Sequence, residues 1–120
     1  MQKKLLFERI KKVYGVEPDY PFNDENAVFR HKHNKKWFAL VMNIPENKFG
    51  LKSDKMVDVV NLKCDPNLTE ELFRDFGIFP AYHMSKTKWI SVLLDGRVDF
   101  EKVKMLVDVS YYLTENKKSR

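Results

Sequence analysis

Five apolar runs, two pairs of which are separated by only three residues, constrain the fold of this chain more than any other feature. The runs are rich in β-branched and aromatic residues, as strands are, and they span residues 27–32, 36–42, 56–64, 78–84 and 88–94. Strands joined by short turns pair antiparallel, because a parallel crossover needs a dozen or more residues. The sequence therefore predicts a mainly antiparallel, five-stranded sheet.

Three helices are predicted around these strands. Residues 2–14 have helical spacing and end at Gly15, and Asp65-Pro66 is typical of the start of a helix that we expect to end near Gly77. The last helix begins after Asp99, and a charged tail follows it at 116–120. The resulting order, α-β-β-β-α-β-β-α, predicts a two-layer α+β fold with the helices on one face of the sheet.

Local signals also predict how the connections run. His33, Asn34 and Lys35 are expected to form a hairpin turn, with Asn34 in the left-handed conformation. Two prolines in residues 17–22 predict an extended connector that buries Tyr20 and Phe22 under the fold.

Length, composition and net charge limit the class of protein to which this chain can belong. A chain of 120 residues is one ordinary domain, and no apolar stretch reaches the roughly 18 residues that a membrane span needs. The N-terminus lacks the pattern of a signal peptide, and the single cysteine, Cys64, forms no internal disulfide, so we expect a reducing, cytoplasmic location. The net charge of +5 favours polyanionic partners only slightly.

The hairpin at 29–37 concentrates positive charge. Arg30, Lys32, Lys35 and Lys36 lie close together, and no acidic residue occurs between Ala27 and Pro45. Such cations neutralise the phosphates of a nucleic acid. Lysines at a hairpin tip also protect an edge strand from pairing with other sheets, so both interpretations remain open.

Two histidines in this hairpin raise the question of a metal site. His31 and His33 are two residues apart and face the same side if they lie on a strand. No carboxylate or cysteine nearby in the sequence completes a ligand set, so neither a metal nor another cofactor is predicted.

A second cluster combines Lys63, Cys64, Tyr82, His83 and Trp89, with Lys86 and Lys88 beside it. It is a candidate ligand site, in which aromatic faces and cations meet a nucleotide or an anion, or else a structural corner. A nucleophilic Cys64 with His83 as its base is a weaker hypothesis, because Asp65 places a negative charge next to the thiol. We therefore expect a protein that is not an enzyme.

Four segments carry a resemblance to a known family. In chain order they are residues 37–40 (WFAL), 60–66 (VNLKCDP), 77–84 (GIFPAYHM) and 89–96 (WISVLLDG), and the Ser110-Tyr111 pair follows them. With these segments the chain resembles the MmcQ/YjbR family of small bacterial proteins. Ser85 and Lys88 depart from its pattern, in which Asn and often His stand at these positions.

The resemblance implies a fold like that of secretion chaperones and a double-wing DNA-binding surface. One wing would be the hairpin from Arg30 to Lys36, and the other would be the connection from Tyr82 to Trp89. We therefore predict a non-catalytic DNA-binding protein with weak sequence preference, whose phosphate contacts are Arg30, Lys32, Lys35, Lys36, Lys86 and Lys88.

Two alternatives from other classes stay open. The first is a protein-interaction or chaperone-like module, including a homo-oligomer, in which the sheet receives a partner. The second is a pocket around Tyr82, His83 and Trp89 that binds or sequesters a small molecule or drug.

Overall fold

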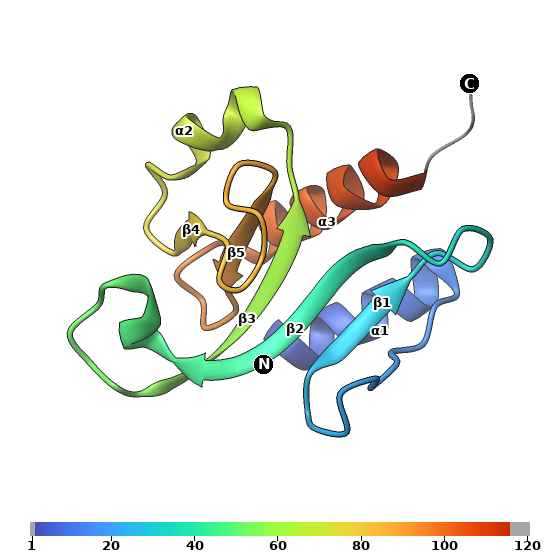
Figure 1. Ribbon diagram of the computed structural model, residues 1–120, viewed down its shortest axis with the longest axis horizontal. Coiled ribbons are helices and arrows are strands. Elements are labelled where there is room, and N and C mark those ends of the chain that lie inside the picture. The colour runs from blue at the N-terminus through green and yellow to red at the C-terminus, as the bar shows by residue number, and fades with distance from the viewer. Residues whose placement is uncertain (1, 116–120) are drawn as a thin grey trace.

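A computed structural model describes residues 2–115, and it places the helices and strands in the predicted order (Figure 1). The helices are α1 (Gln2–Tyr14), α2 (Thr69–Leu72) and α3 (Phe100–Glu115). The strands are β1 (Ala27–Arg30), β2 (Trp37–Pro45), β3 (Met56–Lys63), β4 (Ile78–Pro80) and β5 (Trp89–Leu93). Short 3-10 turns lie at Glu46–Phe49 and Pro66–Leu68, and the predicted charged tail at 116–120 lies outside the described residues.

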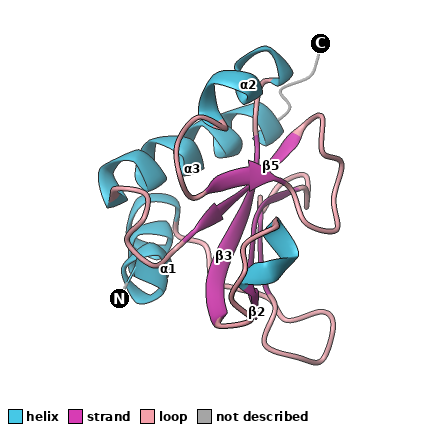
Figure 2. Ribbon diagram, turned by 90° about the vertical axis from the view of Figure 1, so that its left-hand side faces the viewer, coloured by secondary structure: helices cyan, strands magenta, loops and turns pink. Residues whose placement is uncertain are grey.

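The five strands form one sheet in the order β1-β2-β3-β5-β4, and every neighbouring pair is antiparallel. Helices α1 and α3 cover one face of this sheet, and the connecting loops lie on the other face (Figure 2). The two-layer α+β fold is thereby confirmed. No helix within residues 2–115 is long and apolar enough to cross a membrane.

Alternation of side chains along the strands gives the sheet two apolar faces. The larger core lies between the sheet and the two long helices and contains Phe29, Phe38 and Leu62. The smaller core is on the face without helices, hereafter the helix-free face, and contains Val28, Leu40 and Met42. Side chains from loops, from β4 and from the 3-10 turn Glu46–Phe49 cover this second core, and neither α1 nor α3 does so.

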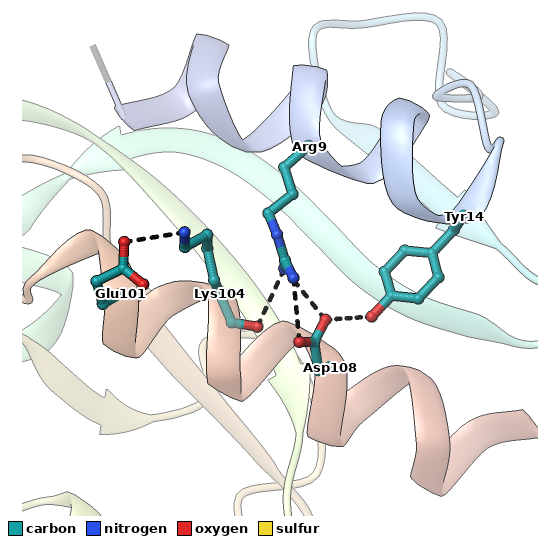
Figure 3. Close-up of polar contacts among 5 residues, drawn as sticks. All are labelled: Arg9, Tyr14, Glu101, Lys104 and Asp108. Atoms are coloured by element: carbon teal, nitrogen blue, oxygen red, sulfur yellow. Dashed lines mark hydrogen bonds and ion pairs between the residues drawn. The ribbon is translucent and has the colours of Figure 1, made fainter.

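Helices α1 and α3 run side by side in the same direction and are joined by polar side chains (Figure 3). Arg9 donates to both carboxylate oxygens of Asp108, at 3.1 and 3.2 Å, and Tyr14 donates to the same carboxylate. Lys104 pairs with Glu101 along α3 and accepts from Arg9 through its carbonyl. Burial on its own would raise the pKa of Asp108, but the hydrogen bonds from Arg9 and Tyr14 outweigh it and hold this pKa below its usual range.

Ser110 fixes α3 against the strands. Its hydroxyl donates to the carbonyl of Phe38 at 2.6 Å and accepts from the amide of Lys63 at 2.8 Å. A fully buried hydroxyl needs such partners, because an unpaired polar group in a core is costly. The next residue, Tyr111, stacks on Tyr14 with ring centroids 3.9 Å apart. The Ser110-Tyr111 pair therefore has a structural role.

Two predicted elements are much shorter in the structure, and the strand predicted over 27–32 ends at Arg30. The segment from Pro66 forms a 3-10 turn and then only the four-residue α2, because it is short and contains weak helix formers such as Asn67 and Thr69. The strand predicted to reach Met84 ends at Pro80, whose nitrogen carries no hydrogen for the ladder. The capping role of Asp65 is confirmed, since its side chain accepts from the amide of Asn67.

The hairpin turn and the connector also differ from expectation. Residue Lys35, with φ of 64°, takes the left-handed conformation, while Asn34 uses its side chain to accept from the amide of Lys36. The connector does not bury its aromatic residues, because Tyr20 and Phe22 are 47% and 48% exposed.

Candidate functional site

The basic hairpin, residues 30–36, is attached to the end of α3. His33 donates to the carbonyl of Glu115 at 3.0 Å, and the side-chain amide of Asn34 donates to the carbonyls of Thr114 and Glu115. These carbonyls belong to the last turn of α3, where carbonyl groups have no backbone N–H partner within the helix. The hairpin thus caps the helix.

His31 anchors the hairpin from inside. Its side chain is fully buried, and its Nε2 lies 2.8 Å from the hydroxyl of Thr114. Because that hydroxyl donates to the carbonyl of Ser110, the imidazole is the donor to Thr114. The Nδ1 atom is buried and has no hydrogen-bond partner within residues 2–115. Burial, and then the neighbouring His33, lower the pKa of His31 below its ordinary value of 6.5, so the ring is neutral.

Both histidines of the hairpin therefore direct Nε2 to α3 rather than to a shared ion. Among the described residues, no group of three or more His, Cys, Asp or Glu side chains is arranged to hold a metal.

The hairpin cations have different surroundings. Arg30 is paired with Asp19 at 2.5 Å, so a carboxylate offsets its charge. The ammonium of Lys32 lies 3.4 Å from the point where a Cβ would stand at Gly15, just beyond the C-terminal end of α1. A lysine there stabilises the negative end of the helix dipole. The side chains of Lys35 and Lys36 are exposed.

A cavity of about 610 Å³ lies between the hairpin and the connector after α1. Arg30, Lys32 and Lys35 line it together with the carboxylates of Glu17 and Asp19. Opposite charges are therefore mixed in this cavity, and it does not present a purely cationic surface.

The second loop, residues 81–88, is held by a buried polar pair on the helix-free face. Asn61 on β3 and Ser91 on β5 lie opposite each other and are fully buried. Ser91 donates to Asn61 at 2.5 Å, Asn61 donates to the carbonyl of Tyr82 at 2.9 Å, and the amide of Tyr82 donates to Ser91 at 3.0 Å. This closed network fixes the start of the loop.

The lysines of the second loop are exposed. The ammonium of Lys86 reaches back to the carbonyl of Ala81 at 2.8 Å, which closes the loop, and Lys88 is connected to the sheet through its carbonyl. His83 is exposed, has φ of 64°, and lies against the ring of Tyr82 with centroids 3.8 Å apart. Trp89 is half-buried and lies opposite Lys63.

The backbone amide of Cys64 donates to the carbonyl of Lys88 at 2.8 Å, but the Cys64 side chain does not join the aromatic residues of this loop. Cys64 is buried in the core under the helices, whereas Tyr82 packs on the helix-free face. Burial, and then the carboxylate of Asp65, raise the pKa of the Cys64 thiol, so it stays protonated. The hypothesis of a Cys64 nucleophile with His83 as its base has no geometric support.

A cavity of about 520 Å³ on the helix-free face lies between the connector before β1, strand β2 and the second loop. Trp37, the residue that follows the hairpin, forms part of it, and so do residues from the connector and from the second loop. Phe22 stands edge-on to Trp37, with ring centroids 5.9 Å apart. The complete lining is Phe22, Asp24, Asn26, Trp37, Leu40, Met42, His83, Met84 and Ser85.

Several of these residues escaped the sequence analysis. Asn61 and Ser91 interrupt apolar strands with polar side chains, which is the signal that could have marked them, since a buried polar residue needs a partner. The sequence predicts Leu40 and Met42 as ordinary core residues, because it does not indicate which face of the sheet α1 and α3 leave uncovered.

Comparison with known proteins agrees with the fold. The YjbR family model matches residues 11–113. Among curated relatives, the uncharacterized protein YyaQ of Bacillus subtilis is 40% identical over 92% of this chain and 95% of its own length. The uncharacterized protein YjbR of Escherichia coli is 31% identical over 70% of this chain and 72% of its own length. A crystal structure of a protein from Pseudomonas syringae has a TM-score of 0.91 and 42% identity, covering 95% of this chain and 99% of the other. The chain belongs to the YjbR family.

Proposed function

We propose that this protein is a non-catalytic DNA-binding protein that contacts DNA with the helix-free face of its sheet. One observation carries the proposal: the base of the hairpin and the second loop border the same cavity, through Trp37 on one side and His83, Met84 and Ser85 on the other. In the chain, Lys36 precedes Trp37, and Lys86 and Lys88 follow Ser85, although none of these lysines lines the cavity.

The contribution of each cation follows from its surroundings. Arg30 is paired with Asp19, and Lys32 lies at the end of α1, so both have partners within the protein. Lys35, Lys36, Lys86 and Lys88 are exposed and, within residues 2–115, form no ion pair with a carboxylate, although the ammonium of Lys86 donates to the carbonyl of Ala81. We assign the phosphate contacts to these four lysines.

The proposed binding has weak sequence preference. Sequence is read mostly by a helix or strand ribbon that enters the major groove, whereas lysines on loops contact phosphates. Helices α1 and α3 lie on the opposite face of the sheet from the second loop (Figure 2), so neither is available as a recognition helix on this surface.

Titration of labelled DNA at several salt concentrations tests the proposal. Four neutralised phosphates give a plot of log K against log salt with a slope of roughly −3 to −4. Replacing all four lysines by glutamine should abolish most of this slope. The matched control replaces Lys4 and Lys12, which are exposed on α1 in the helix layer, and should leave binding almost unchanged. Binding that ignores salt, or no binding at low salt, overturns the proposal.

A further inference from the structure

The cavity of about 520 Å³ on the helix-free face combines flat apolar surfaces with polar groups. Trp37 and Phe22 present an indole and a phenyl ring, and Met42 and Met84 add thioethers, which adapt to the shape of a ligand. Asp24, Asn26 and Ser85 supply carboxylate, amide and hydroxyl groups to the same cavity. A planar heterocycle with polar edges is the kind of molecule that such a lining fits.

Hydrogen-bonding capacity remains in this polar part. The Asp24 carboxylate accepts from the backbone amide of Asn26 at 2.9 Å and from its side-chain amide at 3.4 Å. Each carboxylate oxygen has a further lone-pair direction, and the carbonyl oxygen of the Asn26 side chain is an acceptor. These groups can therefore receive the N–H groups at the edge of a nucleobase.

We propose that this cavity receives an unpaired nucleobase of single-stranded DNA, with the base against Trp37. The inference rests on the proposed function and sharpens it, because it names single-stranded rather than duplex DNA as the preferred ligand. In a duplex the bases are stacked and paired, so none can enter a cavity without being extruded at a cost of a few kcal/mol. A single strand presents unpaired bases at no such cost.

Lysines that neighbour the lining residues in the chain favour a nucleic-acid strand over an apolar peptide. No lysine lines the cavity itself, but exposed Lys36 precedes Trp37 in the chain and exposed Lys86 follows Ser85. A strand that places one base in the cavity carries phosphates outward in both directions, and these phosphates meet the lysines. An uncharged apolar peptide would leave both lysines without a counter-charge.

The two tryptophans make the test specific. Trp37 lines the cavity, whereas Trp89 lies opposite Lys63 and is not part of the lining. In the variant Trp89→Phe, emission reports on Trp37 alone, and in Trp37→Phe it reports on Trp89 alone. Should either variant fail to fold, the unchanged chain labelled with 5-fluorotryptophan gives separate fluorine NMR signals for the two indoles.

Three ligands of equal length are titrated: a single-stranded oligonucleotide, the same phosphate chain with abasic sites, and the duplex. We expect the oligonucleotide to quench Trp37 and leave Trp89 unchanged. We also expect it to bind at least about fivefold more tightly than the abasic strand, the low end for one stacked base. The abasic strand and the duplex should leave Trp37 emission unaltered.

The outcomes separate the two proposals. Equal affinity for all three ligands with unchanged Trp37 emission overturns the base site and leaves DNA binding intact. Binding of none of them overturns both. Quenching of Trp37 by the apolar dye anilinonaphthalene sulfonate but not by the oligonucleotide also overturns the base site, because it assigns the cavity to an apolar ligand.

Discussion

The Nε2 atom of His31 lies 2.8 Å from the hydroxyl of Thr114, so the basic hairpin is bonded to the last turn of α3 across 83 residues of sequence. His33 and Asn34 complete this attachment at the carbonyls of Thr114 and Glu115. The position of the basic hairpin is therefore set by the end of α3.

This attachment predicts a loss of stability in mild acid. His31 is neutral when folded because burial lowers its pKa, while in the unfolded chain it takes up a proton near its ordinary value of 6.5. The contribution of His31 is thus fully present above pH 6.5 and is lost as the pH falls below that value towards the lower folded pKa. Urea unfolding at pH 8, 6 and 5 measures the effect.

Matched variants isolate His31 from the carboxylates that titrate in the same range. In the variant His31→Phe, the phenyl ring fits the aromatic surroundings of Phe38 and Tyr111. This variant should show a smaller drop in unfolding free energy from pH 8 to pH 5 than the unchanged protein. The control His83→Asn changes an exposed residue whose left-handed backbone suits asparagine, and it should retain the full drop. Equal pH dependence in all three proteins contradicts this role of His31.

Two lysine variants should distinguish a lysine that stabilises the fold from a lysine that binds DNA. Lys32→Gln removes an ammonium from the C-terminal end of α1 and should lower the unfolding free energy by about 0.3–1 kcal/mol. Lys88→Gln changes an exposed loop lysine and should lower DNA affinity with little effect on stability. Urea unfolding and DNA titration on both variants check the pair, and the reverse pattern would refute the assignment.

The buried pair Asn61 and Ser91 should control the second loop. Asn61→Ala leaves the hydroxyl of Ser91 without its acceptor and the carbonyl of Tyr82 without its side-chain donor, which we expect to cost about 1–3 kcal/mol. Amide hydrogen exchange in residues 81–88 should also become faster. In the control Asn43→Ala, on neighbouring β2, the hydrogen bond lost to Asp58 is exposed, and the change should be small. A similar cost for both substitutions would argue against the network.

Cys64 should be inert while the protein is folded. Its thiol is buried and its pKa is raised, so both access and thiolate fraction are low. Reaction with Ellman's reagent at pH 7.5 should be slow in buffer and complete quickly in urea. Rapid modification of the native protein would show that the thiol is accessible and would revive the nucleophile hypothesis.

Elements with strong local signals could be predicted from the sequence. Gly15, with φ of 66°, ends α1 as expected, because the left-handed conformation costs glycine little. The valine-rich run of β3 is a central strand, and α3 begins after Asp99. In each case residues within a few positions of one another determine the outcome.

The features that could not be predicted from the sequence depend on tertiary contacts. His31 belongs to a polar, basic segment, and only the packing of α3 makes it a buried residue. The shortened β4 reflects Pro80 together with a network that draws Tyr82 towards Ser91. The cavity unites the connector, β2 and the second loop, which are far apart in sequence, so neither spacing nor composition could predict it.

Mapping amide chemical shifts of the isotope-labelled protein during titration with single-stranded DNA tests the central proposal most directly. We predict that the shifts concentrate in residues 32–37 and 82–88, while Leu5 on α1 and Tyr112 on α3, both exposed on the helix layer, stay in place. Shifts confined to α1 and α3, with both loops unchanged, would contradict the proposal that the helix-free face binds DNA.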